Sequence, residues 1–178
     1  AADHVLEIGT GWGGFAIHAA THYGCRVTTT TISDRQHEMA QQRFAAAGLS
    51  ERITLLKQDY RDLTGTFDKL VSIEMIEAVG HHFLDEFFRV CSERLKPEGM
   101  LLLQAITIRD LVCDLHTRSV DFIKLYIFPG SCIPSVTAIS KAVAEKTDLR
   151  IFHLEDITAH YARTLRLWRK NFFHNIDR

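Results

Sequence analysis

Short apolar runs alternate with amphipathic stretches along the first hundred residues. Five runs have the length and composition of buried strands: 4–8, 26–30, 53–57, 69–73 and 100–106. Between and after them, apolar residues recur at helical spacing in four stretches: 13–22, 34–47, 82–95 and 136–146. This alternation predicts an α/β fold with a mostly parallel, doubly wound sheet and helices on both faces. Ligands of such sheets lie at the carboxyl ends of the strands.

The alternation is interrupted after the fifth expected strand. We expect residues 109–135 to form a helical insertion over the carboxyl edge of the sheet, and a further strand near Leu149–His153. The insertion carries apolar residues at i, i+1, i+4 and i+5, namely Phe122, Ile123, Tyr126 and Ile127. This stripe either packs one helix against the body of the protein or forms a wall around a substrate.

Length and composition fit one globular domain over residues 1–178. The formal net charge of −1 disfavours an electrostatic nucleic-acid binder. The four cysteines lie far apart without a Cys-x-x-Cys pair, as in a cytosolic protein with reduced thiols, and no metal site is expected. No apolar run has the length of a membrane span.

Both ends of the chain lie close to expected elements. The sequence begins just before the first strand and stops just after a helical pattern, as expected of a fragment. We therefore expect an incomplete sheet and an exposed apolar surface that favours association.

A glycine-rich turn follows the first strand. Glu7 precedes Gly9, Gly11 and Gly13, a spacing shorter than the dinucleotide fingerprint G-x-G-x-x-G, although Gly14 completes that pattern as well. Dinucleotides and S-adenosylmethionine therefore compete as ligands, beside a purely structural turn. A dinucleotide site requires an acid at the end of the second strand, and the sequence has none there. Glu7, in contrast, can hold the ammonium group of S-adenosylmethionine through water or nearby backbone.

Five segments together resemble cyclopropane-fatty-acyl-phospholipid synthases and the related mycolic acid cyclopropane synthases: 9–14, 31–36, 58–62, 75–80 and 126–135. The resemblance covers nearly the whole chain. It implies a Rossmann-like class I methyltransferase that uses S-adenosylmethionine and transfers its methyl group to the double bond of unsaturated phospholipid acyl chains. It further implies a cytoplasmic protein with peripheral contact at the inner membrane face, and a possible homodimer.

The resemblance also assigns the cofactor residues. It places S-adenosylmethionine at Gly9 and Gly11, with Thr31, Ile32 and Gln36 beside the ribose and adenine. Asp59 or Tyr60 would lie near the rim of the adenine. Considered without the resemblance, Gln36 is an exposed residue in a first helical turn and Asp59 a turn cap.

The resemblance implies that a bound bicarbonate removes a proton after methyl transfer. Its holders would be Glu77, the backbone of Ile106 and the hydroxyl of Tyr161. The sequence departs from the bacterial phospholipid enzymes where Gln104 and Ala78 replace histidines. An amide donates hydrogen bonds but cannot carry a proton. Cyclopropane formation is the favoured outcome. The alternatives are a methyl-branched or methylene product, another carbon or small-molecule methyltransferase, and a cofactor-binding fragment without turnover.

The apolar and aromatic side chains around the expected site would keep water from a carbocation. The candidates are Phe122, Tyr126, Phe128, Tyr161 and Trp168.

Overall fold

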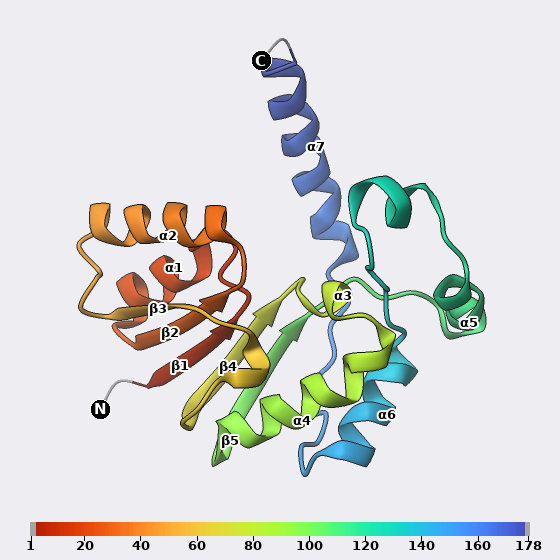
Figure 1. Cartoon of the computed structure of the whole chain (residues 1–178), viewed down its shortest axis with the longest axis horizontal. Coiled ribbons are helices and arrows are strands. Elements are labelled where there is room, and N and C mark those ends of the chain that lie inside the picture. Colours follow the sequence, from red (N-terminus) through yellow and green to blue (C-terminus); the bar gives the residue numbers. More distant parts are fainter. Residues whose placement is uncertain (1–2, 177–178) are drawn as a thin grey trace.

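A five-stranded parallel sheet forms the centre of the protein. The structure, a computed structural model, describes residues 3–176. The strands in chain order are β1 (His4–Ile8), β2 (Arg26–Thr31), β3 (Ile53–Lys57), β4 (Phe67–Ile73) and β5 (Leu95–Gln104). Their order across the sheet is β3-β2-β1-β4-β5, with every neighbouring pair parallel (Figure 1). The predicted α/β class is confirmed, and the order reverses between β1 and β4, where such sheets bind ligands.

Helices cover both faces of this sheet. Helices α1 (Gly14–Tyr23) and α2 (Asp34–Ala46) lie on one face, and α4 (Leu84–Arg94) and α6 (Val136–Lys146) lie on the other (Figure 1). The remaining elements are shorter or peripheral: η1 (Tyr60–Asp62), α3 (Ile76–Val79), η2 (His81–Phe83), α5 (Asp110–Arg118), η3 (Ile123–Ile127) and α7 (Thr158–His174). Among residues 3–176, no helix is both long and apolar enough to cross a bilayer.

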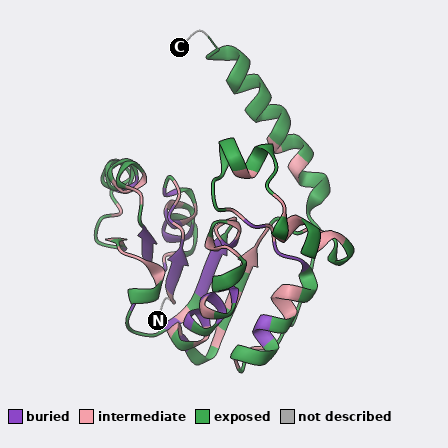
Figure 2. Ribbon diagram, turned by 45° about the vertical axis from the view of Figure 1, so that its right-hand side comes forward, coloured by how far each residue is buried: buried purple, intermediate pink, exposed green. Residues whose placement is uncertain are grey.

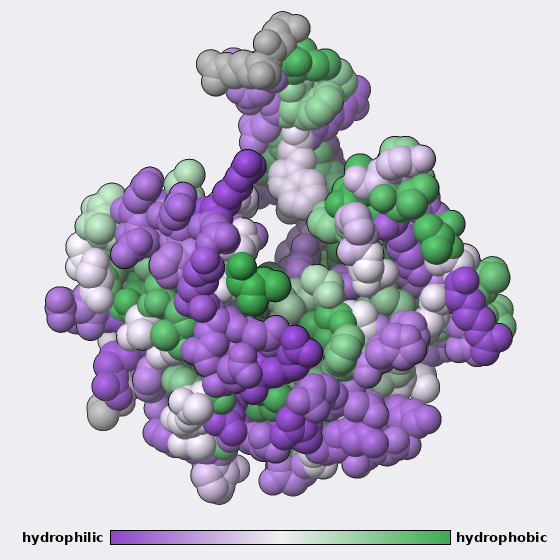
Figure 3. All heavy atoms as spheres, in the orientation of Figure 1, coloured by the Kyte–Doolittle hydropathy of each residue, from purple (hydrophilic) through white to green (hydrophobic). Residues whose placement is uncertain are grey.

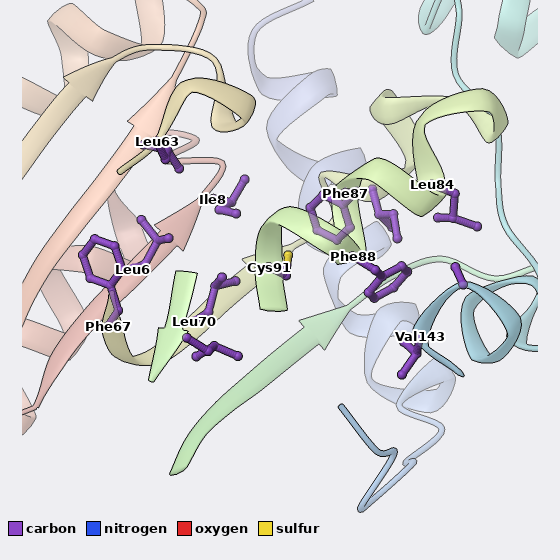
Figure 4. Packing of buried hydrophobic residues seen from close by; sticks show 13 residues of the cluster. Leu6, Ile8, Leu63, Phe67, Leu70, Leu84, Phe87, Phe88, Cys91 and Val143 are labelled. Carbon is purple, nitrogen blue, oxygen red and sulfur yellow. The ribbon is translucent and has the colours of Figure 1, made fainter. Parts of the chain in front are cut away.

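The larger core lies between the sheet and α4. Phe87, Phe88 and Cys91 of α4 are essentially inaccessible and pack toward Leu6 and Leu70 of the central strands (Figure 4). Burying a side chain of this size stabilises the fold by roughly 1.5–3 kcal/mol. Burial is concentrated in the strands and in the helix faces turned toward them (Figure 2). This packing holds the carboxyl ends of β1 and β4 in fixed relation.

The structure differs from the sequence predictions at two places near β5. The fifth predicted strand, 100–106, begins earlier in the structure: β5 starts at Leu95, and its register with β4 shifts between the pairs Phe67↔Leu95 and Lys69↔Met100. The predicted strand near Leu149–His153 is wrong: the segment is not part of the sheet. An extended segment becomes a strand only by pairing with a neighbour, and among residues 3–176 β5 pairs with β4 alone.

The insertion is helical, as predicted, but its apolar stripe does not pack. Segment 109–135 contains α5 and the wide turn η3, in which the Phe128 N–H donates to the Ile123 carbonyl at 2.8 Å. Phe122, Ile123, Tyr126 and Ile127 are all exposed. Of the two interpretations of the stripe, packing onto the body is therefore wrong, and a role as a substrate wall stays a prediction.

Apolar surface is exposed on the sheet and on α7, as expected. Met100 and Leu102 of β5 are 60% and 54% exposed. Helix α7 projects away from the body and is exposed along almost its whole length (Figures 1 and 2). Hydrophobic side chains gather on the surface of the lobe that carries α5, and an opening separates α7 from the side formed by α1 and α2 (Figure 3). Association through these surfaces stays a prediction.

Candidate active site

The glycine turn connects β1 to α1 in a left-handed conformation. Gly9, Gly11 and Gly13 have φ angles of 101°, 52° and 80°. A Cβ atom at Gly9 would lie 3.1 Å from the Met75 side chain, and one at Gly13 would lie 2.6 Å from the Phe44 ring. A Cβ at Gly11 would meet nothing within 4 Å. Packing thus requires two of the glycines, and the space beside Gly11 is open to a ligand.

Glu7 is buried beneath this turn rather than exposed in it. It is 3% exposed, and its Oε2 atom accepts a hydrogen bond of 2.7 Å from the Thr29 hydroxyl. The Thr29 hydroxyl lies 2.7 Å from that of Thr10 in the turn. Burial raises the pKa of Glu7 to about 7, against the opposing effect of the Thr29 hydrogen bond. Glu7 thus reaches the turn through a chain of two hydroxyl groups.

Replacing Glu7 by glutamine should remove a pH-dependent loss of stability. The folded state binds the Glu7 proton more tightly than the unfolded chain, whose pKa is near 4.5. Stability should therefore fall as the pH rises from 4.5 to about 7, by about 3 kcal/mol for this group. Denaturant unfolding of the complete protein at several pH values measures the loss. Glu7→Gln should flatten that part of the profile, and the exposed Glu51→Gln should not; identical profiles would contradict the prediction.

Three predicted cofactor residues lie together at the end of β2. The Thr31 hydroxyl donates to Gln36 Oε1 at 2.9 Å, and Ser33 caps α2 by accepting from the Gln36 N–H at 3.3 Å. Ile32 is 74% exposed between them. The Thr31 bond orients the Gln36 amide, so Gln36 is more than an unconstrained surface residue. A role in holding ribose or adenine stays a prediction.

Asp59 and Tyr60 follow β3. Asp59 accepts a 2.9 Å hydrogen bond from the Arg61 N–H and forms a 2.9 Å ion pair with the Arg61 guanidinium. The Tyr60 ring packs edge-on against Phe87 with centroids 5.6 Å apart, and burial raises its pKa to about 12. Asp59 therefore acts as a turn cap here, which leaves its second predicted role, near the adenine, as a prediction.

Glu77 and Ile106 meet at the ends of β4 and β5. Glu77 Oε1 accepts a hydrogen bond of 2.5 Å from the Ile106 N–H. Glu77 Oε2 is buried and has no hydrogen-bond partner among the described residues. Burial raises the pKa of this carboxyl above its usual value. Buried polar atoms normally have a hydrogen-bond partner, so Glu77 Oε2 is an acceptor with room for a further hydrogen bond.

Gln104 and Tyr161 both donate to Glu74, a residue that the sequence analysis missed. The Gln104 amide lies 2.9 Å from Glu74 Oε1, and the Tyr161 hydroxyl lies 3.1 Å from Oε2. Glu74 directly follows β4, so an acid at the carboxyl end of a buried strand was the available signal. The contact with Tyr161 could not be found this way, since 87 residues separate the two.

The glycine turn after β1 and the two acids after β4, Glu74 and Glu77, lie at the same edge of the sheet. The close approach of Gly9 to Met75 shows that the loops after β1 and β4 are neighbours. The sheet is parallel, and its strand order reverses at this edge. A glycine turn follows β1, and polar groups follow β2 to β5. These features define a Rossmann-like α/β protein with a site for a nucleoside-type ligand. Among residues 3–176, no group of three or more His, Cys, Asp or Glu side chains could hold a metal ion.

Comparison with known proteins identifies the class as methyltransferases and gives the family. The chain belongs to the mycolic acid cyclopropane synthetase family, whose model matches residues 1–178. Tuberculostearic acid methyltransferase UfaA1 of Mycobacterium tuberculosis is 42% identical over 177 residues, which are 98% of this chain and 41% of that protein. Cyclopropane-fatty-acyl-phospholipid synthase of Escherichia coli K12 is 41% identical over 168 residues, 94% of this chain and 41% of that enzyme.

A solved structure shows the same fold. The crystal structure of mycolic acid cyclopropane synthase CmaA1 complexed with SAH and CTAB superimposes with a TM-score of 0.87 at 27% identity, over 98% of this chain and 64% of that one. The chain spans about two fifths of the length of these two curated relatives.

Proposed function

We propose that residues 1–178 form the S-adenosylmethionine-binding domain of an enzyme that methylates the double bond of unsaturated acyl chains in phospholipids, with a cyclopropane ring as the favoured product. The observation that carries the proposal is the shared sheet edge, where the open space at Gly11 and the unpaired Glu77 Oε2 lie on neighbouring loops. The family match supports it, as does the phospholipid synthase among the relatives.

The acyl chain needs an apolar, water-poor site. S-adenosylmethionine supplies an electrophilic methyl group, and an alkene is a weak nucleophile that must be held in line with it. A cavity of about 230 Å³ lies between α3 and the insertion, lined by Ile76, Cys132, Ile133 and Pro134 among others. The exposed aromatic residues of segment 122–128 lie in the same insertion. Together they supply candidate walls for an acyl chain.

The proton that leaves after methyl transfer needs an acceptor. Glu77 Oε2 is buried, unpaired and part of a carboxyl whose pKa is raised. A carboxylate with a raised pKa takes up a proton more readily than an ordinary one. We assign Glu77 as this acceptor.

Bicarbonate, which the family resemblance implies, does not fit the side chains as they are arranged. Its anionic oxygens would need donors, but the Ile106 N–H already donates to Glu77 and the Tyr161 hydroxyl to Glu74. The carboxylates of Glu74 and Glu77 also lie at the expected bicarbonate position, and like charges repel a further anion. In our proposal the proton therefore goes directly to Glu77.

A second outcome is a methylene or methyl-branched product. Gln104 cannot relay a proton, and a 42% identical relative is named as a tuberculostearic acid methyltransferase.

Membrane contact and location are further parts of the proposal. Helix α7 contains four Arg or Lys residues and no acid, and it exposes Trp168, Phe172 and Phe173. A basic helix with exposed aromatic residues suits peripheral contact with an anionic membrane. We propose a cytoplasmic protein at the inner membrane face, with a homodimer as one possible assembly.

Mass spectrometry of lipids tests the function. The complete protein, expressed in a bacterium without its own ring-forming enzyme, should add the mass of one CH₂ group to unsaturated phospholipid acyl chains. A ring resists mild hydrogenation, whereas a methylene product takes up hydrogen. A methyl-branched product also resists hydrogenation, but it is two hydrogen atoms heavier than the ring, so mass and treatment together separate the outcomes. Unchanged lipids in the presence of folded, cofactor-binding protein would contradict the proposed activity and favour a binding module.

A further inference from the structure

Glu74 has an unusual backbone conformation. It is the one non-glycine residue in the described part of the chain with a positive φ, 49°. This conformation costs free energy for a residue with a side chain, so it persists only where its surroundings hold it. Here the Glu74 N–H donates to the Gln104 carbonyl at 2.8 Å, and its carboxylate accepts from the Gln104 amide. The strained backbone places the carboxylate at the edge that carries the candidate site.

The Glu74 carboxylate connects three elements. It follows β4, holds Gln104 of β5 through Oε1 and holds Tyr161 of α7 through Oε2. Among the described residues, the first turns of α7 have two hydrogen bonds that join them to other segments through a side chain: the Thr158 N–H donates to the nearby Asp156 carboxylate, and the Tyr161 hydroxyl donates to Glu74, which lies far away in the sequence. In Figure 1 the base of α7 lies close to the carboxyl ends of β4 and β5. Glu74 therefore holds the side chains of Gln104 and Tyr161. Burial raises the pKa of the Tyr161 hydroxyl, and the Glu77 carboxyl is close enough to Tyr161 for its charge to raise that pKa further.

We propose that Glu74 is a positioning residue that takes the place of an external anion, so that proton release after methyl transfer proceeds to Glu77 without bicarbonate. The inference rests on the proposed function. A hydroxyl group has one proton to donate, and Tyr161 directs it at Glu74. With the Ile106 N–H directed at Glu77, the two donors that the resemblance assigns to bicarbonate, this N–H and the Tyr161 hydroxyl, are already used within the chain.

The charge of Glu74 also acts on Glu77. Burial is the first cause of the raised pKa of Glu77, and the negative charge of Glu74 adds to it. The pKa of Tyr161 is likewise raised, first by burial and then by its bond to Glu74, which keeps the hydroxyl protonated as a donor. The Glu74 carboxylate thus makes Glu77 a stronger proton acceptor, and it makes the surroundings of Glu77 less favourable for a bound anion.

The proton step balances without another reactant. The π electrons of the alkene form the new carbon–carbon bond to the methyl group, the sulfonium carbon–sulfur bond breaks toward sulfur, and the neighbouring carbon becomes positive. A C–H bond then breaks, and its electron pair closes the ring or forms a double bond. The proton goes to Glu77 Oε2 and is later released to solvent. No oxidant or reductant is needed.

Bicarbonate dependence tests the proposal in the complete protein. Turnover is measured with an unsaturated phospholipid in CO₂-depleted buffer with and without added bicarbonate, for the natural protein, Glu74→Gly and Glu74→Gln. The natural protein should change by less than about twofold. Glu74→Gly should lose about tenfold or more in depleted buffer and recover in part with bicarbonate, because an external anion can then replace the missing carboxylate. Glu74→Gln, similar in size but uncharged, should also become responsive.

Folding and function are separated by two further readouts. Glycine adopts a φ of 49° freely, so Glu74→Gly should keep its fold, which a melting curve checks. If its melting temperature falls sharply, Glu74→Gln alone decides. A natural protein that requires bicarbonate, or a folded Glu74 variant whose turnover does not respond to bicarbonate, would overturn the inference. Absence of methyl transfer by the natural protein would instead remove the proposed function itself.

Discussion

Replacing Glu77 by glutamine should lower the turnover of the complete protein by about 10²- to 10⁴-fold, the usual range for a positioned proton-transfer group. Glutamine keeps the size of the side chain and can still accept from the Ile106 N–H, so the loop should keep its shape. Its amide cannot act as the proton acceptor that the carboxylate provides. The loss should appear in kcat, while the affinity for S-adenosylmethionine, measured by calorimetry, should stay unchanged.

The pH profile gives this test a second measurement. Glu77 must be ionised to accept a proton, so the rate should rise with pH through its pKa, which lies above the usual 4.5. That rise should disappear from the residual activity of Glu77→Gln. Glu51→Gln, a change of the same type at an exposed residue before β3, should behave like the natural protein. Parental turnover in a folded Glu77→Gln protein would show that Glu77 is only a loop acid.

Replacing Gly11 by valine should abolish binding of S-adenosylmethionine. A Cβ at this position meets no protein atom within 4 Å, so a branched side chain would fill the space that we assign to the ligand. The φ of 52° is also strained for valine, and destabilisation alone could weaken binding. Isothermal calorimetry on folded protein measures the affinity.

Gly48→Val controls for that strain. Gly48 has a φ of 67°, and a Cβ there also meets nothing within 4 Å, but it follows α2 and lies outside the glycine turn. It should lose stability to a similar extent and keep its cofactor affinity. An unchanged affinity in Gly11→Val would remove the cofactor site from this turn.

The local parts of the site could be predicted because the chain encodes them over short distances. The glycine turn follows the first apolar run directly, and Ser33 caps α2 with its side chain as its sequence position indicates. The strand near Leu149–His153 could not be judged in this way, because a strand depends on a partner elsewhere in the chain. The packing of the apolar stripe of the insertion onto the body could not be judged for the same reason. Its helical spacing indicates that the residues share one face, but not what covers that face.

The sequence by itself determined the alternating α/β order, the parallel sheet and the edge at which Gly11 and Glu77 lie. Hydrophobic periodicity and glycine conformation are local properties, and the handedness of β-α units leaves few ways to assemble them. Only the tertiary structure decided that Glu7 is buried and that Tyr161 and Gln104 meet at Glu74. The hydrogen bonds of Glu74, which follows β4, with Gln104 of β5 and Tyr161 of α7 depend on packing across long sequence separations, which no local pattern records.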